Sequence, residues 1–379
     1  MAGFEIRKSL KFNPKTKMGG LFDSINIISK PKSFGVDFSN SVLKIMQISA
    51  AGGNRKVAGW KGKKIPKGVI DSCEIKKPED FKQLFKEALA EAKGTFKGRN
   101  IVLSIPEAKV FTRVIEIPLM KESEAEESVK WETESNIPIS VDNVYYDWQI
   151  LKKKKKEMEV LVMAVPKKIV DNYLEVFDKA GYPVVALEPE SVANGRSIVA
   201  SGEKDFSLII DIGMDYSNFA IHKGQAPIFT ANSAVCGKMF TDVAVKHFGT
   251  SFEKAESYKI KTGLGKTKKE KEEAGEVFKP VLETLIQDVS KTTEFFRENL
   301  WKDQKNKEIK KVILTGGGSN LKGLDAYLSS KLSQKVVLAD PWVEFGFKNN
   351  IPPISKQDSQ GFSTVIGLSL RARDHENYD

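Results

Sequence analysis

Hydrophobic and polar positions along this chain of 379 residues follow two periods that alternate from segment to segment. A period of two, typical of half-buried strands, is found in the following segments: 33–49 (two strands joined by a turn), 100–106, 111–118, 144–151, 157–166 and 205–224. A period of 3.6, typical of helices with one apolar face, is found in 78–93, 123–136, 167–180, 252–261 and 277–300. Strands and helices that follow one another in this way predict an α/β fold.

Two strand–turn–strand units, at 35–49 and 208–224, have similar combinations of aspartate, glycine and small polar residues at their turns. Turns of this kind offer backbone N–H groups to phosphate oxygens. A third turn, Gly316-Gly317-Gly318, has no side chains that would keep a flat ligand from its backbone. The three turns together predict a nucleotide site.

The composition favours a packed globular protein, because 40% of the residues are hydrophobic and 29% are charged. No apolar run approaches the ~18–20 residues of a membrane span, and the N-terminus lacks the apolar core of a secretory signal. Two cysteines and three histidines give neither a disulfide framework nor a metal cluster. We therefore expect a soluble cytoplasmic protein without a metal-ligand cage of its own.

The net charge of +10 comes largely from the first 17 residues, from 61–67 and from five consecutive lysines at 152–156. The lysine run separates two alternating segments, so we expect it to be the tip of a hairpin. A solvated loop is the favoured interpretation, contact with an anionic membrane surface is the alternative, and no nucleic-acid partner is expected.

Three further expectations concern single segments. Residues 18–28 are predicted to form a short amphipathic helix after a basic leader, and the charged stretch 259–276 is predicted to be an exposed loop. Trp131 is expected in the core, with the wall of a partner groove as the alternative.

The segments GVDFSNSVLK (35–44), IIDIGMDYSN (209–218) and TGGGSNLKGL (315–324) resemble the phosphate-1, phosphate-2 and adenosine signatures of the actin-like ATPase superfamily. Residues 101–151 resemble the type IV pilus assembly protein PilM family more specifically. The hallmarks of that resemblance are Ile117-Pro118, Met120, Trp131-Glu132, Ile137-Pro138 and Asp147. The resemblance extends from about Met18 to Ala372.

This resemblance implies an actin-like, ribonuclease H-like fold of two lobes with the 1C subdomain found in the cell-division protein FtsA. The implied division of the chain is as follows: 1–33 leader and amphipathic segment, 34–104 first part of domain 1A, 105–185 subdomain 1C, 186–206 return to 1A and interdomain connection, 207–345 domains 2A and 2B, and 346–379 C-terminal return to 1A and tail.

The resemblance also implies that ATP and Mg²⁺ bind between the lobes. Asp211 would hold the metal, directly or through water, and Asp37 is a second candidate whose alternative role is to cap its turn. The implied nucleotide contacts are Ser39, Asn40, Ser41, Lys44, Gly213, Ser217, Asn218, Glu256, Lys259, Gly316, Gly317, Gly318, Ser319 and Lys322. An ordinary surface salt bridge is the alternative for the pair Glu256 and Lys259.

A departure from the family pattern in the first turn suggests weak binding, and the question of hydrolysis turns on two glutamates. Ser39 stands where the family has glycine, which costs either approach distance to a phosphate or backbone strain. Glu188 or Glu190 could position an attacking water, but a structural role beside Pro189 is equally compatible with the sequence. We therefore expect the nucleotide to act as a conformational clamp, with slow or absent hydrolysis.

For partners, the resemblance implies the cytoplasmic N-terminal tail of a PilN-like membrane protein, held at the inner membrane of a bacterium and linked to the pilus motor and platform. The strands at 110–118 and 144–151 are candidate edges for such a tail. A homo-oligomer is left open. The alternatives are a small-molecule kinase of the same superfamily, a type II secretion module and an FtsA-like filament protein.

Overall fold

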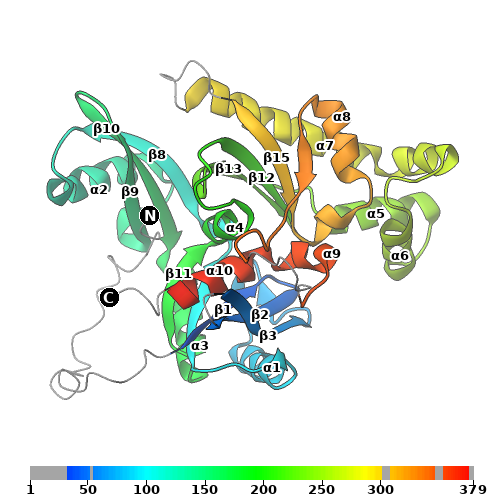
Figure 1. The fold of residues 1–379 in the computed structure, drawn as a ribbon, viewed down its shortest axis with the longest axis horizontal. Helices are drawn as coiled ribbons and strands as arrows, with labels where there is room; N and C mark the ends of the chain where they lie inside the picture. Colours follow the sequence, from blue (N-terminus) through cyan, green and yellow to red (C-terminus); the bar gives the residue numbers. More distant parts are fainter. Residues whose placement is uncertain (1–31, 52–53, 301–307, 346–352, 375–379) are drawn as a thin grey trace. The chain divides into compact units, whose positions relative to one another are not determined.

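The computed structural model describes residues 32–51, 54–300, 308–345 and 353–374, which form two compact units (Figure 1). Unit 1 consists of the described residues up to Ala193 and from Val365 onward, and unit 2 consists of the described residues from Asn194 to Thr364. The leader and the amphipathic helix predicted at 18–28 lie outside the described residues.

Unit 1 is built on a six-stranded sheet of order β11-β7-β1-β2-β3-β6. Its strands are β1 (Ser33–Phe38), β2 (Val42–Ala51), β3 (Asn54–Lys64), β6 (Lys93–Gly94), β7 (Asn100–Ile105) and β11 (Val184–Pro189). A separate hairpin consists of β4 (Ile70–Asp71) and β5 (Glu74–Ile75), and the unit's helices include α1 (Pro78–Ala90) and α3 (Lys167–Lys179). Strand β1 is buried at every position, as expected for a central strand with both faces covered.

Aromatic side chains fill the core beside this sheet. Phe38 of β1 lies edge-on to Tyr173 of α3, with ring centroids 4.9 Å apart, and Phe81 of α1 lies edge-on to Phe177 of α3 at 5.7 Å. Such edge-to-face pairs add to the stabilisation from burial alone. They anchor α3 against the strand that leads into the turn after Phe38.

The three-stranded sheet of unit 1, called the inserted sheet below, has the order β8-β10-β9. It consists of β8 (Phe111–Pro118), β9 (Val144–Lys153) and β10 (Glu157–Pro166), with α2 (Ala125–Asn136) packed against it. Because β10 is central, both strands predicted as candidate edges are outer strands of this sheet.

Two of the narrower expectations for this region have opposite outcomes. Residues 154–156 connect β9 to β10, so the lysine run forms a hairpin tip, as predicted. The core placement of Trp131 is wrong, because its side chain is 68% exposed on α2.

Unit 2 is built on a five-stranded sheet of order β14-β13-β12-β15-β16. Its strands are β12 (Phe206–Ile212), β13 (Ser217–Lys223), β14 (Ala226–Ser233), β15 (Ile309–Thr315) and β16 (Val336–Leu338). Its helices are α5 (Gly237–Phe248), α6 (Phe252–Thr262), α7 (Lys268–Asn299), α8 (Leu324–Leu332) and α9 (Lys356–Ser359). Helices α4 (Glu190–Ile198) and α10 (Ser363–Asp374) each contain residues assigned to both units.

Helix α7 overturns the expectation of a loop across 259–276. Helix α6 continues to Thr262, and α7 already begins at Lys268. Thr267 and Glu270 form a capping box, in which each side chain bonds the other residue's backbone N–H. No helix in the described part of the chain has both the length and the apolarity of a membrane span.

Candidate functional site

The turn between β1 and β2, residues Ser39 to Ser41, is closed by its own serine. The Ser39 hydroxyl oxygen accepts hydrogen bonds from the backbone N–H groups of Ser41 and Val42, each at 3.3 Å. Ser39 is absent from the described residues that have a positive φ, so the turn does not carry the backbone strain considered from the sequence. What the serine changes is the availability of the two N–H groups, because its hydroxyl already occupies them.

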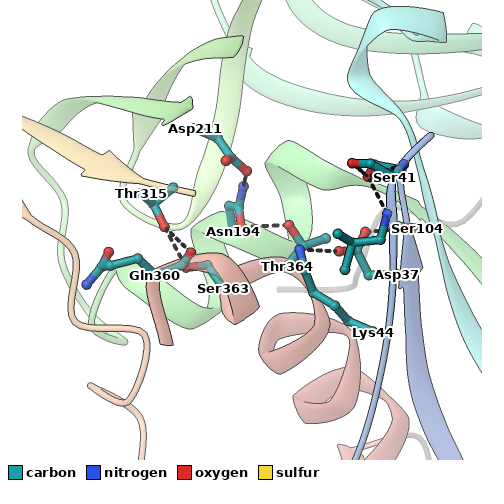
Figure 2. Close-up of polar contacts among 12 residues, drawn as sticks. Asp37, Ser41, Lys44, Ser104, Asn194, Asp211, Thr315, Gln360, Ser363 and Thr364 are labelled. Carbon is teal, nitrogen blue, oxygen red and sulfur yellow. Dashed lines mark hydrogen bonds and ion pairs between the residues drawn. The ribbon is translucent and has the colours of Figure 1, made fainter. Parts of the chain in front are cut away.

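Asp37 and Lys44 face each other across β1 and β2 in register. The Asp37 carboxylate is 5% exposed, accepts a hydrogen bond from the Ser104 hydroxyl at 2.9 Å, and lies 3.4 Å from the Lys44 ammonium (Figure 2). These contacts compensate its charge within unit 1 and favour the anchoring role. Metal binding by Asp37 stays a prediction.

The carboxylate of Asp211, at the end of β12, is oriented by an asparagine that the sequence analysis missed. Asn194 donates from its side-chain amide to Asp211 Oδ2 at 2.9 Å, and Thr364 donates its hydroxyl to the Asn194 amide oxygen at 3.1 Å (Figure 2). Asp211 is half-buried, whereas Asn194 is 2% exposed. The carboxylate is therefore held in one orientation by a buried polar chain.

The turn between β12 and β13 packs against the start of α5. Gly213 closes the turn by donating its N–H to the Tyr216 carbonyl at 3.0 Å, and its own carbonyl accepts from the Gly237 N–H at 2.8 Å. Ser217 donates its hydroxyl to the Val235 carbonyl at 2.5 Å, and Asn218 is the register partner of Asp211 on β13. The turn predicted to meet phosphate is thus fixed by main-chain bonds on both sides.

The glycine turn, Gly316 to Gly318, lies directly beside Asp211, because β12 and β15 pair in parallel with Asp211 opposite Thr315. Gly316 has φ 81° and ψ 164°, a backbone region restricted to glycine. A Cβ there would come within 2.2 Å of Asp211 Oδ1 and 2.5 Å of the Ile212 carbonyl oxygen. A Cβ on Gly318 would come within 2.3 Å of the Ile212 side chain, whereas a Cβ on Gly317 would meet nothing within 4 Å, so this turn has two closed positions and one open one.

Polar contacts fix both ends of the glycine turn. The Thr315 hydroxyl lies 2.5 Å from that of Ser363 and donates to the Gln360 carbonyl at 3.2 Å (Figure 2). Ser319 donates its hydroxyl to the Gly316 carbonyl at 2.7 Å. Lys322 points to another element, since its ammonium donates to the Lys261 carbonyl at 3.0 Å.

Glu256 and Lys259 form an ion pair at 2.7 Å on α6. The Lys259 ammonium also donates to the Gly237 carbonyl at 2.9 Å and to the Thr241 hydroxyl at 3.0 Å, and Glu256 contacts the same hydroxyl. The pair therefore connects α6 to the first turn of α5. It is more than a surface salt bridge, since Lys259 is 9% exposed, and its role toward adenosine stays a prediction.

Glu188 and Glu190 are both engaged within unit 1. Glu188 is fully buried and pairs with Arg371, which is 5% exposed. Glu190 accepts a hydrogen bond from the Glu107 N–H at 3.1 Å, and Glu107 accepts one from the Ser191 N–H at 3.0 Å. These contacts favour the structural alternative for both carboxylates, and a water-positioning role is left as a prediction.

The residues of unit 2 are suited to a magnesium nucleotide. Asp211 supplies a partly exposed carboxylate oxygen, the ligand type that Mg²⁺ prefers. The open side of Gly317 leaves backbone that a flat ring could approach. The donor set and the shape both fit such a group, and these contacts are proposed below.

A pocket of about 710 Å³ opens in unit 1 between α2, the start of β9 and the start of α3. It is lined by Ser123, Glu124, Glu126, Glu127, Lys130, Val141, Asp142, Val144, Tyr145, Tyr146 and Lys167, and is called the α2 pocket below. Burial, together with the Glu126 carboxylate, raises the pKa of Tyr146. Carboxylates outnumber ammonium groups in the lining, which favours a cationic occupant.

One lysine of the hairpin tip is committed to carboxylates. The Lys154 ammonium lies 2.9 Å from Glu157, 2.9 Å from Glu116 and 3.0 Å from Glu159, and these hydrogen bonds raise the pKa of Lys154 above its usual range. This cluster fastens the tip to β8 and β10. It does not test membrane contact by the remaining lysines.

Comparisons with known proteins identify the fold. The structure of MreB5 of Spiroplasma citri bound to AMPPNP shares the fold, with a TM-score of 0.56 and 14% identity over 92% of this chain and 98% of that one. A stretch of 109 residues is 33% identical to the cell division protein FtsA of Enterococcus hirae. It covers 28% of this chain and about a quarter (24%) of that protein. The fold is therefore the actin-like ATPase fold, as predicted.

The family follows from two closer matches. A chain of the PilM-PilN type IV pilus biogenesis complex is 25% identical, with a TM-score of 0.75, over 90% of this chain and 98% of that one. The family model of the type IV pilus assembly protein PilM matches residues 35–373. The chain belongs to this family, which confirms the resemblance drawn from residues 101–151.

Proposed function

We propose that the chain is an ATP-binding, actin-like scaffold of the type IV pilus assembly complex. It binds the cytoplasmic N-terminal tail of a PilN-like membrane protein at the bacterial inner membrane and couples that protein to the pilus motor that drives twitching. The observation that carries the proposal is the match to a chain solved as part of a PilM-PilN complex over nearly its whole length.

For nucleotide, we propose that Asp211 holds Mg²⁺ and that the turn containing Gly213 contacts phosphate, while the glycine turn contacts the adenosine. Mg²⁺ would neutralise phosphate charge when bound, and Asn194 would keep the carboxylate turned toward it. The structure of MreB5, which has the same fold, was solved with AMPPNP bound, and this supports the assignment.

We propose that the bound nucleotide stabilises one conformation of the protein and that its hydrolysis supplies no energy for the function. Glu188 is paired with Arg371 and Glu190 is bonded to backbone, so neither carboxylate is arranged as a base for water. In unit 1 the Ser39 hydroxyl competes with phosphate for two backbone N–H groups. Weak binding with at most slow hydrolysis follows from both features.

For the partner, we propose that the tail binds along β9 with side chains entering the α2 pocket. Strand β9 is an outer strand of the inserted sheet, so its main chain can pair with an added segment. The pocket is lined by Val144 to Tyr146 at the start of this strand. Helix α2 packs mainly on β8, which makes β9 the better candidate edge.

The proposal is tested by fluorescence polarisation with synthetic N-terminal tails of bitopic pilus proteins, in the presence and absence of Mg-ATP. Glu126→Lys places an ammonium in the pocket lining and should weaken tail binding at least tenfold, since like charges at a contact are strongly unfavourable. Glu132→Lys makes the same change elsewhere on α2 and should leave the affinity within twofold. Absence of tail binding, with phosphorylation of a small acceptor instead, would support the kinase alternative.

A further inference from the structure

The connection between β9 and β10 carries five consecutive lysines, at 152–156, and the proposed function uses none of them. The main chain closes this connection, because the Lys154 N–H donates to the Glu157 carbonyl at 2.8 Å. Glu157, the first residue of β10, stands opposite Pro118, the last residue of β8. The end of β8, the end of β9 and the start of β10 therefore meet at one end of the inserted sheet (Figure 1).

Lys154 differs from its neighbours in the run. Its ammonium contacts three carboxylates, and its side chain is only 20% exposed. Lys153, Lys155 and Lys156 are exposed, and none of them is paired with a carboxylate of the described part of the chain. Five lysines against three carboxylates leave this end of the sheet with a net charge of +2. Lys154 thus fixes the connection in place, while three other ammonium groups face solvent.

A large apolar side chain lies beside these lysines. Leu119, which follows β8, is 46% exposed. Its N–H donates to the Lys156 carbonyl at 2.9 Å, so the leucine is held next to the lysine run by the main chain. Exposed apolar side chains bordered by lysines are typical of surfaces that lie at a membrane interface, because long lysine stems keep their ammonium groups at the level of the headgroups.

We propose that Leu119, Lys153, Lys155 and Lys156, called the basic tip below, dock on the anionic surface of a lipid bilayer. The three ammonium groups would meet headgroup phosphates, and the leucine would enter the boundary between headgroups and acyl chains. A lipid surface fits better than a nucleic acid. The leucine has no counterpart on a phosphate backbone, and residues 152–156 include neither an aromatic ring nor an arginine that would stack on bases.

The basic tip is separate from the site proposed for the partner tail. The α2 pocket is lined by residues at the start of β9, whereas the lysine run lies at the end of this strand. A strand of 10 residues spans roughly 30 Å. The inference therefore goes beyond the proposed function and does not depend on it, since lipid binding is measured without the tail.

The test is sedimentation of the full chain with vesicles, one set of neutral phosphatidylcholine and one set in which a third of the lipid is anionic phosphatidylglycerol. The chain should bind the anionic vesicles more tightly, and added salt should weaken this binding. A triple variant, Lys153→Gln, Lys155→Gln and Lys156→Gln, should bind them at least tenfold more weakly, since each lysine near an anionic surface contributes about fivefold.

The matched control removes the same charge elsewhere. Lys268→Gln, Lys269→Gln and Lys271→Gln change three exposed lysines in the first turns of α7 and should leave the affinity for vesicles within about threefold of the parent. Because all six lysines are exposed, both triple variants should keep the parental Tm.

A separate variant tests the apolar part of the basic tip. Leu119→Ser keeps every charge and should weaken vesicle binding about 3- to 10-fold, because its side chain no longer leaves water on docking. Binding of the same variant to heparin, a soluble polyanion, should equal that of the parent. This difference separates a lipid surface from a soluble anionic partner.

Three results would overturn the inference. The first is equal affinity of the parent for anionic and neutral vesicles. The second is parental vesicle binding by either the triple variant at 153, 155 and 156 or Leu119→Ser, which would assign any lipid contact to another part of the chain. The third is an affinity for duplex DNA that depends on the same lysines and exceeds the affinity for vesicles. All three leave the proposed function standing, because the tail is absent from these assays.

Discussion

Alanine at Gly316 should destabilise unit 2 and disturb Asp211, the proposed magnesium ligand, whereas alanine at Gly317 should not disturb the fold. The Gly316 backbone lies in a region restricted to glycine, and holding another residue there costs about 1–3 kcal/mol. The added Cβ would also approach the Ile212 carbonyl oxygen to 2.5 Å, and relieving such crowding typically costs another ~1–3 kcal/mol. The sum, roughly 2–6 kcal/mol, corresponds to a fall in Tm of at least ~4 °C at about 2–4 °C per kcal/mol.

Thermal unfolding measures the loss of stability, and titration with a fluorescent ATP analogue measures nucleotide binding. Both are carried out in the presence and absence of Mg²⁺. In Gly316→Ala the added Cβ would lie 2.2 Å from Asp211 Oδ1, so the carboxylate must move. Nucleotide binding by this variant should therefore no longer depend on Mg²⁺. Gly317→Ala should stay within ~0.5 kcal/mol of the parent in stability but bind nucleotide more weakly, since its methyl group occupies the open side of the turn. A parental Tm in Gly316→Ala would refute the steric reasoning, and parental affinity in Gly317→Ala would refute the placement of the ligand.

Three further predictions concern unit 1. Ser39→Gly frees two backbone N–H groups and should tighten ATP binding about 5-fold, because the two long hydrogen bonds that the hydroxyl accepts contribute roughly 1 kcal/mol together. A titration that shows equal or weaker ATP binding would contradict this. Arg371→Met removes the ion-pair partner of the buried Glu188 carboxylate and should cost about 3–5 kcal/mol in urea unfolding, most of it regained when Glu188→Gln is added; no recovery would argue against the ion pair. Hydrogen bonds from Lys168 and, to a smaller extent, Lys76 lower the pKa of Glu74 to about 2. The ionised carboxylate therefore stabilises the folded state, by at most ~1 kcal/mol because solvent screens the charges. This contribution is full above pH ~4.5 and is lost as the pH falls toward 2. The urea midpoints of the parent and Glu74→Gln should therefore converge over that range.

The turns of the candidate site could be predicted because their residues lie close together in the sequence. The strand that has Asp211 next to its last residue and the strand that ends before Gly316 are each visible as an apolar run followed by a turn. Pairing of β12 with β15 then brings the two ends together at one edge of the sheet. Local chemistry and one parallel pairing were enough to assemble this part of the site.

Asn194 could not be found in the same way. Its partners, Asp211 and Thr364, are 17 and 170 positions away, so no short motif contains the contact. The available signal was a polar amide within the small and apolar run Val192 to Gly195. A buried amide needs a hydrogen-bond partner, but the sequence does not say which one.

The two errors came from reading residue type before spacing. Helix α2 buries Ala125, Val129 and Thr133, which lie four residues apart on one face. Trp131 stands midway between the last two and therefore on the opposite face, whatever its hydrophobicity. Likewise, the charge density of 259–276 suggested a loop, although Thr267 and Glu270 have the spacing of a capping box that starts a helix.

The substitution of Ser39 for glycine was visible in the sequence, but its consequence depends on which atom the backbone faces. A positive φ would have made the Cβ the problem, and weak binding would then reflect strain. Ser39 is not among the described residues with a positive φ, so the proposed obstacle is its hydroxyl, which occupies the N–H groups that a phosphate bound at this turn would need. Ser39→Ala separates the two explanations, because it keeps the Cβ and removes the hydroxyl. If the hydroxyl is the cause, alanine should tighten ATP binding nearly as much as glycine does, and equal affinity of the alanine variant and the parent would return the explanation to the Cβ.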